Sequence, residues 1–392
     1  MAGNVYFDNA ATTPLDPRVA EAMRPWLGEK FGNPSSLHSF GHRAREAVER
    51  ARAQLAALLT AQPDEIVFTA SGTEADNLAL TGVAEAFGVD NCHIVTSSIE
   101  HPAVLETCRY LERRGVEVTY LPVDEEGIVN PASLAEVLRP TTKLVSVMAA
   151  NNVVGTVQPI AELAQIAHEH GALFHTDAVQ AVSKLPLDVG AQQIDLLSLS
   201  AHKLNGPQGV GALFLRKDLE ITAFVHGGGQ ERGLRSGTEN VAGLVGLGRA
   251  AELVEAEMSE DAARLVDFSD RIIETLAEKI PNAYLIGHRY RRLPGHLCLG
   301  FRGQENEGIT LLLELNEAGI AASSGSACSA QHVAESSYVL TAMGFDPIRA
   351  RGSLRVTLGR FTTEAEVDHF LEVLPQAVAS LRPITSHALL SA

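Results

Sequence analysis

Short apolar runs alternate with amphipathic stretches over the first half of the chain. Runs rich in Val, Ile, Leu and Phe predict strands at 66–69, 93–97, 116–121, 143–149, 173–177, 195–199 and 211–215. The intervening stretches predict helices at 43–59, 73–87, 102–114, 131–138 and 160–169, after a short helical pattern that begins at Pro17. Strands spaced by helices are typical of right-handed βαβ units. The pattern therefore predicts a mostly parallel sheet with helices on both faces.

The pattern changes after Gly227-Gly228-Gly229. The residue pattern at 241–280 predicts an almost continuous helix, which suits a long connector between two domains. Beyond about residue 285 the predicted strands (296–301 and 353–358) and helices (306–317 and 364–381) are fewer and farther apart. We therefore expect an α/β fold with a large domain at 15–260 and a smaller α+β domain made of 1–14 and 261–392.

Composition and charge narrow the class of protein. The chain has 392 residues, of which 45% are hydrophobic and 20% charged, as in an ordinary soluble globular protein. The net charge of −17 argues against direct binding of the chain to nucleic acid or to an anionic membrane. The N-terminus lacks the basic start and apolar run of a secretory signal, and no apolar run reaches about 18 residues. We expect a soluble, cytoplasmic protein.

The cysteines and histidines argue against a disulfide framework and a metal site. The four cysteines, at 92, 108, 298 and 328, show no Cys-x-x-Cys spacing. His38 and His42 have the i,i+4 spacing of a helical metal site, but they flank Phe40-Gly41, which is a poor helix interior. We therefore expect no dedicated metal site.

A lysine at the end of an apolar strand is the first candidate for chemistry. The run at 196–199 leads into Ser200-Ala201-His202-Lys203 and then a Gly/Pro turn. Burial of a lysine disfavours its charged form and lowers its pKa, and a neutral amine can form a Schiff base with pyridoxal 5'-phosphate (PLP). For a single lysine, however, exposure at the surface is the commoner situation.

Other chemistry-bearing residues follow predicted strands, where ligands bind in open α/β sheets. A helix start at Gly72-Thr73 suits a phosphate, although Thr73 could simply cap that helix. Asp177 could pair with a pyridinium nitrogen or cap the next helix, and Gln180 could donate to a phenolate oxygen. His101 could stack on a planar ring or be solvated. The Asn151-Asn152 amides could reach substrate and cofactor.

Taken together, these segments resemble the cysteine desulfurases of the NifS/IscS type, within the class V aminotransferase family of PLP enzymes. The resemblance extends over nearly the whole chain, from residues 7–14 to residues 354–361. Its most specific motifs are Gly72-Thr73-Glu74, Glu100-His101, Asp177 with Gln180, Ser200 to Lys203, and His226 to Arg232. It implies the fold of PLP-dependent transferases of the aspartate aminotransferase type (fold type I).

The resemblance also implies roles for individual residues. Lys203 would carry the cofactor as an internal aldimine, with Asp177 on the pyridine nitrogen, His101 stacked on the ring and Gln180 on the phenolate oxygen. Asn152 would contact cofactor and substrate, and Arg355 would bind the substrate carboxylate. The phosphate would be held by Gly72, Thr73, Ser200 and His202. Thr238 would reach the phosphate of a partner subunit, which implies a homodimer.

Cys328 distinguishes among PLP reactions. It lies in a run of Ser, Gly and Ala that offers no large side chain to bury it, and it reads as part of a loop. The resemblance implies that L-cysteine becomes L-alanine while its sulfur forms a persulfide on Cys328, with His101 as proton relay. That sulfur would then serve an iron–sulfur scaffold protein or another acceptor, including tRNA or cofactor thiolation.

Two alternatives stay open at this point, and a few residues depart from the family pattern. One alternative is a related class V enzyme, namely a selenocysteine lyase, a cysteine sulfinate desulfinase or an aminotransferase. The other is a catalytically inactive scaffold protein.

Val153 stands where the family often has glutamate, Ala201 replaces a frequent glycine and Ser329 a frequent threonine, and the segment 330–335 also differs. These departures bear on which sulfur acceptor is used.

Overall fold

A seven-stranded sheet forms the centre of the computed structural model, which describes residues 4–325 and 336–381. The strand order is β2-β8-β7-β6-β5-β3-β4, and the neighbours from β7 to β4 are all parallel. β8 runs antiparallel to both β7 and β2. The predicted mostly parallel sheet is confirmed. Its strands are β2 (Ile66–Thr69), β3 (His93–Ser97), β4 (Glu117–Leu121), β5 (Thr142–Ser146), β6 (Leu173–Asp177), β7 (Leu196–Ser200) and β8 (Gly211–Leu215).

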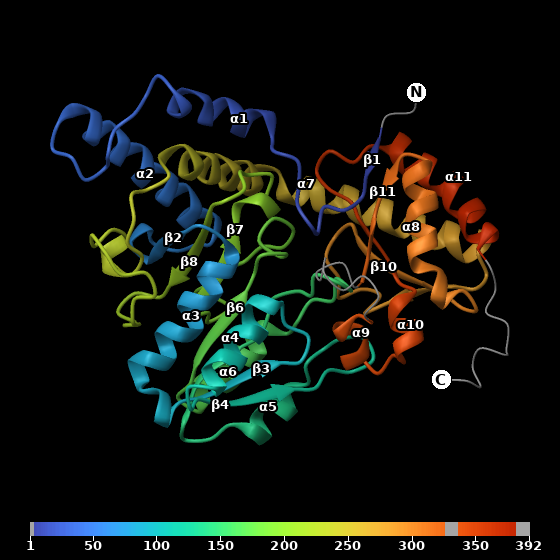
Figure 1. Ribbon diagram of the computed structural model, residues 1–392, viewed down its shortest axis with the longest axis horizontal. Helices are drawn as coiled ribbons and strands as arrows, with labels where there is room; N and C mark the ends of the chain where they lie inside the picture. The colour runs from blue at the N-terminus through green and yellow to red at the C-terminus, as the bar shows by residue number, and fades with distance from the viewer. Residues whose placement is uncertain (1–3, 326–335, 382–392) are drawn as a thin grey trace.

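Helices cover both faces of this sheet, so successive strand residues are buried on opposite sides (Figure 1). Val67 packs with α3 and α4, whereas the adjacent Phe68 packs with α2 and α7. Ile94 and Val95 of β3 divide in the same way, which explains why whole strands read as apolar runs. The helices are α1 (Pro17–Met23), α2 (Ser39–Leu58), α3 (Gly72–Phe87), α4 (Pro102–Glu112), α5 (Pro131–Val137), α6 (Ile160–Glu169) and α7 (Val241–Lys279).

A second, smaller sheet has the antiparallel order β12-β13-β10-β9. The two predicted strands, β10 (His296–Phe301) and β13 (Leu354–Thr357), form its centre, and β9 (Ala283–Ile286) and β12 (Ser323–Ser324) were not predicted. β1 (Val5–Tyr6) pairs in parallel with β11 (Ile320–Ala321), so this strand joins the same part of the molecule as the small sheet (Figure 1). The helices here are α8 (Gly308–Glu317), α9 (Tyr338–Ala342), α10 (Pro347–Arg351) and α11 (Glu364–Ser380).

The long helix α7 belongs to both hydrophobic cores. Leu247 and Val254 pack in the core of the large sheet, and Leu265 and Ile272 pack with Phe370 in the core of the small sheet. We propose that these cores correspond to a large domain at 15–260 and a small domain made of 1–14 and 261–392.

Among the helices of residues 4–325 and 336–381, none combines the length and apolarity needed to cross a bilayer. The 3₁₀ helices are η1 (Arg24–Leu27), η2 (Pro63–Glu65), η3 (Val89–Asn91), η4 (Ala201–Lys203), η5 (Glu231–Gly233) and η6 (Glu305–Glu307).

The region around Gly41 was predicted wrongly. α2 begins at Ser39 and includes Gly41, which the sequence analysis treated as a poor helix interior. His38 caps the helix by accepting a hydrogen bond from the Gly41 backbone N–H at 3.2 Å. A Cβ on Gly41 would lie 2.3 Å from the Ser36 carbonyl oxygen, so close packing against the preceding loop accounts for the glycine.

Candidate active site

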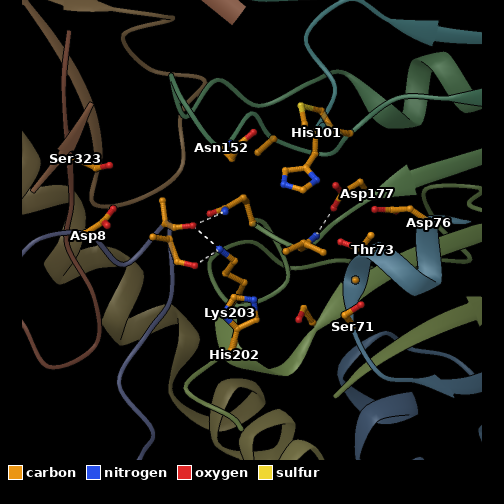
Figure 2. A pocket seen from close by; sticks show the side chains of 18 of the residues that line it. Asp8, Ser71, Thr73, Asp76, His101, Asn152, Asp177, His202, Lys203 and Ser323 are labelled. Atoms are coloured by element: carbon orange, nitrogen blue, oxygen red, sulfur yellow. Dashed lines mark hydrogen bonds between the residues drawn. The ribbon is translucent and has the colours of Figure 1, made fainter. Parts of the chain in front are cut away.

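Most of the residues singled out in the sequence meet in one cavity of about 430 Å³ at the carboxyl end of β6 and β7. This volume is in the range of small-molecule sites. Ten of the predicted site residues line it: Gly72, Thr73, His101, Asn152, Asp177, Gln180, Ser200, His202, Lys203 and Arg355. They come from the ends of strands in the large sheet, from two helix starts, from two connecting loops, and from β13 of the small sheet (Figure 2).

Lys203 enters the cavity from η4, directly after the buried strand β7. Its Nζ donates hydrogen bonds to the backbone carbonyl oxygens of Ala10 and Ala11, the latter at 2.7 Å (Figure 2). Thr13 fixes this N-terminal segment on the same turn, since its Oγ1 donates to the His202 carbonyl at 2.9 Å. A segment far away in the sequence therefore positions the amine.

The start of α3 forms the wall opposite this segment. Ser71 caps the helix by accepting from the Glu74 N–H at 3.1 Å, so the alternative in which Thr73 is the cap was wrong. A Cβ on Gly72 would lie 2.6 Å from Val179 Cγ2, which leaves room for glycine only. The first N–H groups of a helix lack intrahelical acceptors, so this end of the cavity suits an anion such as a phosphate.

Asp177 is buried at the end of β6. Its Oδ1 accepts from the Val179 N–H at 2.9 Å within a turn, and no helix of the described chain begins there for it to cap. Burial raises the pKa of this carboxyl above its ordinary value, while nearby His101 and Lys203 act in the opposite direction. A cationic partner that enters the cavity would favour its ionised form.

The two histidines of the cavity are held in defined orientations. His101 caps α4, because its Nδ1 accepts from the Ala103 N–H at 3.1 Å, and it is not a solvated loop residue. Burial lowers its pKa, and a neutral ring with Nδ1 as acceptor carries its proton on Nε2. His202 Nδ1 pairs with Thr12 Oγ1 at 3.0 Å, and burial lowers its pKa to about 4.

Arg355 reaches the cavity from the small sheet. Its side chain is 2% exposed. Nη1 donates to the backbone oxygen of Asn152 at 3.0 Å, and Nη2 donates to Asp8 Oδ1 at 2.9 Å. Gln180 donates from Nε2 to the Ala10 carbonyl at 2.9 Å, which ties the N-terminal segment to the turn after β6.

Several lining residues were not identified from the sequence as site residues: Asp8, Ser71, Asp76, Met148 and Ser323. Asp76 lies one turn after Thr73 on the same face of α3, and this i,i+3 spacing could have revealed it. Its carboxyl is buried, and Oδ1 makes no hydrogen bond within the described residues. Burial and the charge of Asp177 raise its pKa well above the ordinary value.

Of the predicted site residues that the structure describes, Thr238 is the one that does not line this cavity. Thr238 is exposed and borders a separate hollow of about 140 Å³ beside Glu239 and Asn240. Cys328 lies outside the described residues, so its predicted role stays a prediction.

The side chains present fit the predicted cofactor. PLP carries a phosphate, a ring nitrogen, a phenolate oxygen and an aldehyde. The cavity offers a helix start cleared by Gly72, a buried carboxyl at Asp177, an amide at Gln180 and an amine at Lys203. Each polar group of the cofactor thus has a partner of suitable chemistry in the cavity wall.

Comparisons with known proteins show the family to which the chain belongs. Residues 5–370 match the family model described as aminotransferase class-V. A cysteine desulfurase IscS of Dictyoglomus turgidum is 48% identical over 387 residues, which cover 99% of this chain and 98% of that protein. A solved structure of a NifS-like protein has a TM-score of 0.90 at 41% identity and covers 96% of this chain and 100% of its own.

A further solved structure, described as SspA in complex with cysteine, has a TM-score of 0.79 at 38% identity and covers 92% of this chain and 100% of its own. The fold class predicted from the sequence is confirmed by these structures. The chain belongs to the aminotransferase class-V family and, within it, to the cysteine desulfurases of the NifS/IscS type.

Proposed function

We propose that this protein is a PLP-dependent cysteine desulfurase that converts L-cysteine to L-alanine and transfers the sulfur atom to Cys328. The family is PLP-dependent, and its relatives are cysteine desulfurases. The observation that carries the proposal is the meeting of Lys203, Asp177 and the start of α3 with Arg355 in one cavity. An amine, a buried carboxyl, an anion site and a guanidinium together match PLP and an amino acid.

Each polar group of the cofactor has a proposed partner. Lys203 would bind its aldehyde carbon, Asp177 the ring nitrogen and Gln180 the phenolate oxygen, with His101 stacked on the ring and Asn152 beside it. The phosphate would lie at the start of α3 and be held by Gly72, Thr73, Ser200 and His202. His202 is suited to a neutral role there, because its pKa is lowered to about 4.

When bound, PLP supplies an electron sink that weakens the bonds around the Cα of an attached amino acid. Arg355 would hold the substrate carboxylate and thereby orient Cα toward Lys203. Once the substrate amine had displaced Lys203 from the cofactor, the released Nζ would remove the Cα proton. The carbonyl oxygens of Ala10 and Ala11 hold this atom at the cavity wall. Asp177, as a carboxylate, would retain a proton on the ring nitrogen. His101 would donate and recover a proton through Nε2.

Cys328 is the proposed sulfur acceptor. Its thiolate would attack the substrate sulfur, so that an S–S bond forms while the substrate C–S bond breaks, and the remaining three-carbon fragment takes up protons to give alanine. The other three cysteines are buried, and burial raises the pKa of Cys92 to about 11 and of Cys298 to about 12. Thiols held neutral in this way are poor nucleophiles.

The proposal extends to partners and location. We propose a homodimer in which Thr238 reaches the cofactor phosphate of the partner subunit. Its exposed position outside the Lys203 cavity supports this role, as do the exposed apolar side chains of Leu27, Phe31 and Leu37. The persulfide sulfur would pass to an iron–sulfur scaffold protein or another sulfur acceptor, in the cytoplasm.

The test is to incubate the purified yellow protein with L-cysteine and to measure alanine together with protein-bound persulfide. Cys328→Ala should keep the cofactor colour but release no sulfide, whereas Cys92→Ala serves as the matched control and should behave like the wild type. Full sulfide release by Cys328→Ala would refute the persulfide role. Parallel incubations with L-selenocysteine and L-cysteine sulfinate separate a desulfurase from a lyase or a desulfinase.

A further inference from the structure

Arg355 shares its buried guanidinium with a carboxylate of the protein itself. Nη2 donates to Asp8 Oδ1 at 2.9 Å, and Nη1 donates to the Asn152 carbonyl. Nε is buried and has no hydrogen-bond partner among the described residues. A substrate carboxylate that binds this guanidinium must therefore share it with the Asp8 carboxylate.

Asp8 is held firmly in this position. Its carbonyl oxygen accepts from the Tyr6 hydroxyl at 3.1 Å and from the Ala11 N–H at 3.0 Å. Its backbone also forms a β-bridge with Thr357, two residues beyond Arg355 on β13. The backbone of Asp8 is therefore fixed beside β13, and the contact with Arg355 Nη2 orients its carboxylate.

Carboxyl groups lie on both sides of the cavity. Asp177, Asp76 and the start of α3 lie together on one side, and Asp8 and Ser323 lie on the other (Figure 2). In the proposed function Lys203 is committed to the cofactor and Arg355 to the substrate α-carboxylate. The other basic side chains in the described lining are His101 and His202, and burial lowers the pKa of both.

We infer that Asp8 is a specificity-determining residue, whose fixed carboxylate beside Arg355 disfavours amino acids that carry a second anionic group. This inference rests on the proposed function. Substrates with an uncharged side chain, such as the thiol of cysteine, leave the α-carboxylate as the single anion on Arg355. A side chain ending in a carboxylate or a sulfinate would add a second negative charge to a cavity whose lining already includes Asp8.

L-asparagine and L-aspartate test the inference, because they have nearly the same shape and differ by one charge. Binding of each to the holoenzyme is measured from the absorbance change of the bound cofactor, which does not depend on turnover. The wild type should bind L-asparagine at least about tenfold more tightly than L-aspartate, as expected for like charges separated by several ångströms in a partly screened site. Asp8→Asn should improve L-aspartate binding about tenfold and leave L-asparagine within about threefold.

The charge-matched control is Asp90→Asn, which removes an exposed carboxylate away from the cavity lining and should change neither affinity. Equal effects of Asp8→Asn on both ligands would overturn the inference. They would show that Asp8 acts only on the α-carboxylate, which both ligands share, either by aligning Arg355 or by competing for it. Equal affinities of the wild type for the two ligands would overturn it without any variant. Alanine formation from L-cysteine is measured separately, so failure of the proposed function and failure of the Asp8 role give different results.

Discussion

Glu100 provides a quantitative test of the electrostatics around the site. This residue lies in the segment that connects β3 to α4, and it is fully buried. Ser97 Oγ donates to Oε1 at 2.6 Å, and the Met148 N–H donates to both oxygens at 3.0 and 3.2 Å. Despite these three contacts, burial raises the pKa of Glu100 from 4.5 to about 8. The free-energy cost of desolvating the carboxylate therefore exceeds the stabilisation that the hydrogen bonds give its ionised form.

The sign of the effect on stability follows from proton binding. In the unfolded chain Glu100 loses its proton near pH 4.5, whereas in the folded protein it keeps the proton until about pH 8. Between these values the folded state binds more protons, so the free energy of unfolding decreases as the pH rises. The full penalty, reached above about pH 8, is about 5 kcal/mol at 1.36 kcal/mol per pH unit. Below pH 4.5 it is absent.

Glu100→Gln removes the charge and keeps an oxygen that can accept from Ser97 and Met148. We expect similar melting temperatures for variant and wild type near pH 5, and an advantage for the variant that grows to about 6 °C near pH 8.5 for a chain of this size. This difference in melting temperature is measured by thermal unfolding of the holoprotein at fixed concentration from pH 5 to 9. Glu136→Gln, on the exposed face of α5, is the control. A difference that stays constant with pH would refute the assigned desolvation of Glu100.

Three further predictions concern single side chains. Glu231→Ala removes the bidentate partner of buried Arg52, at 2.7 and 2.8 Å, and should lower the free energy of unfolding in guanidinium by about 3–5 kcal/mol. Gly72→Ala places a Cβ 2.6 Å from Val179 Cγ2 and should weaken PLP binding, measured by equilibrium dialysis, by about tenfold or more. Unchanged affinity would show that Val179 moves aside without affecting the site. Lys203→Ala should reduce alanine formation from L-cysteine to background, and turnover above background would exclude its role at Cα.

The large sheet was predictable because its strands are buried on both faces. Runs such as 66–69 and 173–177 coincide with β2 and β6, since nearly every residue in them packs against a helix layer. The cavity was predictable for a related reason. Parallel strands bring their carboxyl ends to one edge. Asp177 at the end of β6 and His101 after β3 are therefore expected to converge, without any knowledge of their contacts.

The remaining features depend on contacts between distant segments. The apolar run of β8 does not reveal that it pairs antiparallel with β7 and β2, because burial on two faces looks the same in either direction. Asp8 and Ser323 lie in short segments whose places are set by pairing with the small sheet. Gly41 could not be placed in a helix by propensity, because its packing against the Ser36 backbone decides the matter.

The N-terminal segment explains why the site needs both parts of the molecule. Asn9 Nδ2 donates to the Thr357 carbonyl at 2.8 Å, and the Ala10 N–H donates to Thr357 Oγ1 at 2.9 Å, so the segment is attached to the strand that carries Arg355. The Ala10 and Ala11 carbonyls meanwhile hold Lys203. A shift of the small sheet relative to the large one would therefore disturb the amine and the guanidinium together. Since the reaction requires the substrate carboxylate and Cα to be positioned at once, this shared support fixes the distance between the two groups that must act on one small molecule.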